Sequence, residues 1–172
     1  MNGLPAPVSN YMGLFYWLKM NIDLGEGLFA IIDDSDFEVV RRHNWVAKIE
    51  GRNTYAVTGR RFKRMHRVIL NAKPDQIIDH KNGNGLDNRR ENLRFCNAHQ
   101  NQGNRKFTLN SPVPFKGVSW KKEKSKFLAK ISNNNKAIFL GYFDCPFKAA
   151  RAYDAKAKEI FGEFAKLNFK EK

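Results

Sequence analysis

The chain has 172 residues, 42% of them hydrophobic, with 14 phenylalanines and a formal net charge of +14. This length supplies one ordinary hydrophobic core or two small ones, and the apolar content argues against a disordered polymer. The positive charge is typical of a protein that binds a polyanion, with nucleic acid the first candidate; a basic chain kept soluble by its lysines is the alternative.

The charge is unevenly distributed along the chain. Residues 105–172 hold 16 Lys and Arg against 6 Asp and Glu, whereas residues 1–104 hold 15 against 11, and this difference predicts two modules. Cys96 and Cys145 show no CxxC spacing, which argues against a zinc knuckle or a disulfide framework and favours an intracellular location. No apolar run reaches the roughly 18 residues of a membrane span, so no membrane partner is expected.

The first 20 residues are set apart from the rest. Residues 12–18 (MGLFYWL) are apolar but short, and no basic region precedes them, so no signal peptide is predicted. We expect a leader or tail, and its role stays open.

Residues 21–71 predict an α/β extension at the start of the first module. The apolar run at 27–33 (GLFAIID) suits a buried strand. A short helix should follow, capped by Asp33, Asp34 or Ser35. Residues 54–59 and 62–70 are expected to be extended or mixed.

A strand, loop, strand and helix are predicted around the sequence IIDHKNGNGLDNRRENLR at residues 77–94. The first strand ends at Asp79 and His80, and the glycines and asparagines that follow favour turns. After a second short strand, Asn97 and Gln100 have the spacing of a capping box. That helix would direct Asn101 toward the same small site as Asp79 and His80.

The C-terminal module is predicted to be a three-stranded antiparallel sheet covered by one helix. After a linker at 108–114, three strand-like runs (FKGVSW, KFLAKIS and AIFLGYF) are separated by turns rich in lysine and asparagine. A helix follows, with Pro146 in its first turn and Gly162 just after its end. Phe147, Tyr153 and Phe161 are expected on its packed face.

The polar residues of the 77–104 region suit phosphodiester hydrolysis. The Asp79 carboxylate and the Asn101 amide oxygen are hard ligands for Mg²⁺. His80 can then act as a general base, with Asn92 holding its second ring nitrogen. The alternative is that Asp79 and the asparagines only form turns and that His80 is solvated; the end-of-strand position in a basic chain favours the catalytic interpretation.

Residues 65–70 (MHRVIL) and 77–104 (IIDHKNGNGLDNRRENLRFCNAHQNQGN) resemble the HNH endonucleases, specifically the homing type associated with phages and introns. The resemblance implies a ββα-metal core at 62–107 with one Mg²⁺ or Mn²⁺ bound by Asp79 and Asn101. It implies His80 as the general base and Asn92 as the residue that orients it. Asn101 stands where many members carry a histidine, which favours Mg²⁺ or Mn²⁺ over zinc. His66 and Arg67 are expected to contact phosphate or support the site.

Residues 115–169 resemble the Apetala-type, or ethylene-response-factor, DNA-binding domain through their GV, LGYF, AARAYD and AKLNF blocks. The resemblance implies that the sheet lies in the major groove of DNA. The residues carried over by position are Lys116, Ser119, Lys121, Lys130, Ser132, Phe139 and Tyr142. Because several arginines of that family are replaced here, we expect contacts to phosphates more than to base edges.

The sequence therefore predicts an α+β DNA endonuclease with an HNH core and a sheet-type DNA-binding domain. Its expected partner is double-stranded DNA in a bacterial or phage-infected cell, and it acts as a monomer or homodimer. A DNA-binding regulator with an inactive HNH core is one alternative. An RNA-processing nuclease is another, but the A-form major groove is too narrow for a sheet to enter.

Overall fold

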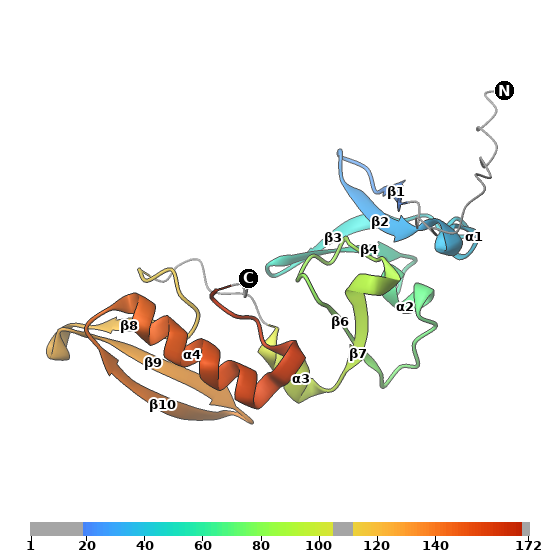
Figure 1. Cartoon of the computed structure of the whole chain (residues 1–172). Coiled ribbons are helices and arrows are strands. Elements are labelled where there is room, and N and C mark those ends of the chain that lie inside the picture. Colours follow the sequence, from blue (N-terminus) through green and yellow to red (C-terminus); the bar gives the residue numbers. More distant parts are fainter. Residues whose placement is uncertain (1–18, 105–111, 170–172) are drawn as a thin grey trace, which may run out of the picture.

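The structure is a computed structural model that describes residues 19–104 and 112–169. Most of the predicted leader at 1–20, the end of the predicted HNH core and most of the linker lie outside the described residues. The described chain mixes helices with small antiparallel sheets (Figure 1). We refer to residues 19–104 as the N-terminal part and to residues 112–169 as the C-terminal part.

The N-terminal part is a series of short strands with two short helices before the 77–104 region. In chain order its elements are β1 (Lys19–Asp23), β2 (Phe29–Asp33), α1 (Phe37–Val40), β3 (Val46–Glu50), β4 (Asn53–Thr58), β5 (Lys63–Arg64) and α2 (Met65–Ile69). The strand predicted at 27–33 and the short helix after it are confirmed, but the predicted cap is not. Asp36 precedes α1, and its side chain makes no capping hydrogen bond. The segment at 62–70 is mixed, as expected, because its two-residue strand passes directly into α2.

These elements share one hydrophobic core. Ile32 of β2, Val40 of α1 and Met65 of α2 are completely buried in it. Trp45 closes one side, and its indole N–H donates to the carbonyl of Val40 at 2.8 Å. The buried indole therefore has a hydrogen-bond partner as well as apolar contacts.

A two-stranded sheet and a helix follow at the positions that the sequence predicts. β6 (Ile77–His80) pairs antiparallel with β7 (Leu93–Cys96), and α3 (Ala98–Gly103) comes next. The capping box is confirmed, since the Asn97 side chain accepts from the backbone N–H of Gln100 and the Gln100 side chain accepts from that of Asn97. This cap fixes where α3 begins relative to β7.

The C-terminal part consists of a three-stranded sheet with one long helix on one face (Figure 1). Its elements are β8 (Val118–Lys121), β9 (Lys126–Asn133), β10 (Lys136–Phe143) and α4 (Pro146–Phe161), and β9 is the central strand. Tyr153 and Phe161 of α4 are buried, as expected. The expectation for Phe147 is wrong: it lies in the first turn, beyond the main cluster, and is 57% exposed. Within the described ranges, no helix is both long enough and apolar enough to cross a membrane.

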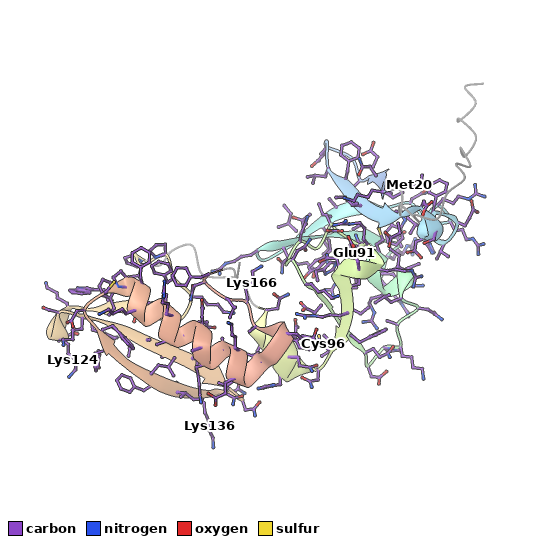
Figure 2. The ribbon with its side chains drawn as sticks, in the orientation of Figure 1. Met20, Glu91, Cys96, Lys124, Lys136 and Lys166 are labelled. Atoms are coloured by element: carbon purple, nitrogen blue, oxygen red, sulfur yellow. The ribbon has the colours of Figure 1, made fainter. Side chains whose placement is uncertain are left out.

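The two parts meet where α3 approaches the C-terminal end of α4. Gly103 of α3 leaves so little space that a Cβ atom there would lie 2.7 Å from Cγ of Phe161 and 2.8 Å from the carbonyl oxygen of Phe164. Cys96 of β7 packs against the hydrophobic cluster that contains Phe161 and Phe164 (Figure 2). Close packing rather than a spacer therefore joins the parts at this point.

Gly103→Ala tests this packing. Alanine normally stabilises a helix by about 1 kcal/mol relative to glycine, but here its methyl group collides with a ring and a backbone carbonyl. We expect the free energy of unfolding to fall by about 1–3 kcal/mol, measured by urea denaturation. Gln102→Ala, the neighbouring half-buried position, is the control and should change it by less than about 0.5 kcal/mol. Stabilisation by Gly103→Ala would contradict the contact.

Candidate active site

Asp79 is a buried carboxylate that three elements surround. The residue, at the end of β6, is 6% exposed. Its Oδ2 accepts from Nε and Nη2 of Arg94 on β7 at 3.0 and 2.8 Å, and its Oδ1 accepts from Nδ2 of Asn104 at 2.7 Å. Asn104 also donates to the carbonyl of His80 at 2.7 Å. The end of α3 is thereby bound to the end of β6.

His80 lies beside Asp79 and is held in its neutral form. Burial lowers the pKa of His80 below its ordinary 6.5, against the smaller opposing effects of Asn88 and of the nearby Asp79 and Asp87. Its Nε2 is 3.5 Å from Oδ1 of Asn88, the long limit of a hydrogen bond. Asn88 donates through Nδ2 to the carbonyl of Leu86, which turns its oxygen toward the ring. This arrangement favours the tautomer with hydrogen on Nε2 and a lone pair on Nδ1.

The predicted hydrogen bond between Asn92 and His80 is wrong, because the Asn92 side chain has other partners. Asn92 accepts from the backbone N–H of Asn82 at 3.0 Å and donates to the carbonyl of Asp87 at 2.7 Å. Asn88 takes the position beside the ring instead. Asn92 ends the 3-10 turn η2 (Arg90–Asn92). Its side chain reaches back across the loop, so its contribution to His80 is indirect.

The β6–β7 loop is held in place by the N-terminal hairpin as well as by its own side chains. Strand β2 exchanges backbone hydrogen bonds with it, from Ile31 to Leu86 at 2.8 Å and from Asn88 to Ile31 at 2.7 Å. Arg90 makes a two-pronged ion pair with the buried Asp36. The loop that positions Asn88 is therefore attached to the main core.

His66 and Arg67 come from α2, and the ring of His66 lies against that of His80. The rings of His66 and His80 have centroids 4.9 Å apart at 84°. Burial, and next the neighbouring His80, lower the pKa of His66 to about 3. Arg67 donates to the carbonyls of Gln76 and Lys73 and so anchors the segment that leads into β6. Both residues line the cleft described next.

Asp79 and His80 open onto a cleft of 560 Å³. The described residues on its wall include Asp79, His80, Asn101 and Asn104 and three arginines, Arg52, Arg64 and Arg67. Asp79 is the one carboxylate among them. The wall is therefore rich in positive charge, as a site for a phosphate diester should be.

The donor atoms suit a hard divalent cation that keeps several waters. Asn101 lies on the cleft wall with Asp79, and its side chain hydrogen-bonds to no other described residue. Oδ1 of Asp79 accepts a single hydrogen bond from the described residues and retains a lone pair. No cluster of three or more His, Cys, Asp or Glu that could hold a metal occurs in the described ranges. One carboxylate and one amide oxygen fit Mg²⁺ or Mn²⁺ bound partly through water and phosphate, and do not fit a closed zinc site.

The segment that contains this site is similar to known proteins. Residues 63–102 match the family model of the HNH endonucleases. An uncharacterized HNH endonuclease of Acanthamoeba polyphaga mimivirus is 29% identical over 151 residues, which span 84% of this chain and 76% of that protein. No solved structure matches the chain significantly. The matched HNH segment contains Asp79, His80, Asn92 and Asn101.

The C-terminal part lies outside the HNH segment, and its sheet has an open face opposite α4. Strand register and burial direct six of the seven predicted DNA-contacting side chains to this open face: Ser119, Lys121, Lys130, Ser132, Phe139 and Tyr142. The rings of Phe139 and Tyr142 lie 5.2 Å apart there. Figure 2 shows Lys136 projecting outward from the same sheet.

Lys116 is the exception and a second correction. It precedes β8, and its ammonium group donates to the carbonyl of Gly103 at 2.7 Å. This contact caps the end of α3, where unpaired carbonyls accept cations. Lys116 therefore joins the two parts of the chain and does not belong to the open face.

The neutral, buried His66 predicts acid-sensitive stability. The unfolded chain takes up a proton at this ring near pH 6.5, whereas the folded chain does so only near pH 3. The free energy of unfolding should therefore fall as the pH drops from 6.5 toward 3, by up to about 1.4 kcal/mol per pH unit for such a group. In urea denaturation at several pH values, His66→Gln should show a shallower dependence. Equal slopes for the two proteins would contradict the assignment.

Proposed function

We propose that this protein is a DNA endonuclease that hydrolyses phosphodiester bonds with one divalent metal ion per site. The observation that carries the proposal is the placement of Asp79, His80 and Asn101 on the wall of one arginine-rich cleft. The HNH match over residues 63–102 supports the same reaction class. The proposed substrate is double-stranded DNA inside a cell. We further propose that the enzyme is a homing endonuclease.

His80 is the general base in this mechanism. The lone pair on Nδ1 takes a proton from a water molecule that attacks phosphorus, while Asn88 keeps the ring in the required tautomer. Burial of the ring keeps it unprotonated near neutral pH. Asn92 contributes indirectly, because it stabilises the loop that carries Asn88.

The remaining cleft residues bind the substrate and the ion. Arg52, Arg64 and Arg67 line the cleft and attract the phosphate backbone. Asp79 and Asn101 would hold Mg²⁺ or Mn²⁺, which supplies charge stabilisation for the transition state and the leaving oxygen. One base and one cleft per chain cut one strand, so a monomer nicks DNA and a double-strand break needs a homodimer or a second event.

The open face of the C-terminal sheet is proposed to bind DNA beside the cleft. Its lysines contact phosphates, and Phe139 and Tyr142 offer exposed rings, 59% and 39% accessible. This surface carries lysines on β8 and on the central strand β9 and aromatic rings on the edge strand β10, which suits nucleic acid better than an apolar protein partner. Lysine in place of arginine favours affinity over base-specific readout.

His80→Ala tests the catalytic assignment. Loss of the general base should reduce plasmid nicking in Mg²⁺ by at least about 100-fold while DNA binding is unchanged, as measured by gel electrophoresis and fluorescence anisotropy. His43→Ala, a histidine outside the cleft lining, is the matched control and should still nick. Wild-type protein that binds DNA but never cuts it in Mg²⁺ or Mn²⁺ would favour a regulator with an inactive core. Preferential cleavage of RNA would favour an RNA-processing nuclease.

A double substitution on the open face tests the DNA-binding surface. Lys121→Gln with Lys130→Gln removes two proposed phosphate contacts and should lower the slope of log affinity against log salt concentration by about 2. Lys148→Gln with Lys158→Gln makes the same change in net charge on exposed positions of α4. This control should leave the slope nearly intact; equal losses in both double variants would refute a specific surface.

A further inference from the structure

Arg94 connects the proposed metal site to the C-terminal part. Its side chain is 12% exposed, and two of its nitrogens bind Oδ2 of Asp79. The third nitrogen, Nη1, donates to the backbone carbonyl of Glu163 at 3.0 Å and lies 3.6 Å from the exposed carboxylate of the same residue. The guanidinium also lies 3.8 Å from the centre of the Phe164 ring. Both Glu163 and Phe164 belong to η4 (Gly162–Phe164), the turn that follows α4.

This arrangement occupies much of the binding capacity of Asp79. Two donors on Arg94 take both lone pairs of Oδ2, and Asn104 takes one of the two on Oδ1. A metal ion that approaches Asp79 therefore meets a carboxylate whose charge is already paired, a few ångströms from a fixed cation.

The other described residues on the cleft wall add no negative charge. Arg52, Arg64 and Arg67 are positive, and of these Arg64 is paired with Glu50, which does not line the cleft. Divalent ions in proteins bind tightly where several anionic oxygens converge. In the absence of a substrate, the cleft should attract a phosphate more strongly than a divalent cation.

We propose that Arg94 is the resident cation of Asp79 and makes binding of the divalent ion conditional on a DNA phosphate in the cleft. The phosphate supplies the missing negative charge, so DNA and the ion bind cooperatively. Arg94 is a positioning residue in this scheme. Because Glu163 and Phe164 hold it in place, the C-terminal part contributes directly to the control of the nuclease site. The inference rests on the proposed function, since it assigns the order in which substrate and ion are bound.

The alternative is that Arg94 only stabilises the fold by neutralising a buried carboxylate. Both roles predict that Arg94→Gln is less stable, because it leaves Asp79 without its partner. They differ in the metal affinity that they predict for Arg94→Gln. If Arg94 is purely structural, its removal should not tighten binding of the divalent ion; if it is the resident cation, its removal should tighten it.

The test is a titration of the full chain with Mn²⁺ in the absence of DNA. The electron paramagnetic resonance signal of the free ion measures how much Mn²⁺ is bound. Removal of a unit charge so close to the site should tighten binding to Arg94→Gln by at least about tenfold over wild type. Arg41→Gln, which removes the same charge from an exposed pair with Glu38, is the matched control and should bind as wild type does. Mn²⁺ should also raise the melting temperature of Arg94→Gln more than that of wild type.

A second variant guards against misfolding of Arg94→Gln. Phe164→Leu keeps the Arg94 side chain but removes the ring that helps to hold it against Asp79, so it should tighten Mn²⁺ binding by about threefold. If both variants fold and bind Mn²⁺ no more tightly than wild type, the inference is overturned.

The coupling to DNA is measured in the His80→Ala background, where the substrate survives. A short DNA duplex should tighten Mn²⁺ binding by at least about tenfold, and Mn²⁺ should tighten DNA binding by the same factor. Adding Arg94→Gln should reduce this coupling. If wild type cleaves DNA but shows no such coupling, the proposed function stands and the inference is overturned. If coupling is seen but wild type does not cleave DNA, the proposed function is overturned and the coupling stands.

Discussion

The buried charge of Asp79 is the constraint on which the arrangement of the site depends. A carboxylate that is only 6% exposed must be neutralised and hydrogen-bonded, or the fold would lose several kcal/mol. Arg94 does this from β7 and Asn104 from the end of α3. Because Asn104 also binds the carbonyl of His80, the same contacts that compensate the charge bring strand, strand and helix together around the cleft.

The run of asparagines and glycines after His80 has a structural reason. The loop must turn sharply, yet several of its polar side chains are buried, and Asn88 is completely inaccessible. Each buried amide therefore needs a partner, and short amide side chains can reach the nearby backbone. Asn92, Asn82 and Asn88 bind within the loop, while β2 binds it from outside. A loop closed in this way can hold the imidazole without a helix or a long strand on either side.

The elements predicted correctly are those that local sequence determines. The cap at Asn97 with Gln100, and the end of α4 before Gly162, depend on residues three or four positions apart or on a single backbone conformation. The partners of Asn92 depend on how the β6–β7 loop closes, and the partner of Lys116 lies on α3 in the other part of the chain, so the sequence could not supply them. Arg94 was missed because one arginine in a basic chain resembles a solvated residue. The antiparallel register, which places Arg94 directly across from Asp79, is the signal that could have found it.

Contact between the two parts also bears on how a cut would relate to the DNA that the protein holds. Lys116 caps α3, the backbone N–H of Lys166 donates to Gly103 at 3.0 Å, and Arg94 reaches η4 from β7. Figure 2 shows Lys166 in the stretch between the parts. A sheet on a free tether would leave the distance from the bound segment to the cleft variable. Two hydrogen bonds to the Gly103 carbonyl and the bridge from Arg94 to η4 would fix that distance instead. In the proposed nuclease, the cut would then fall at a constant offset from the DNA bound by the open face.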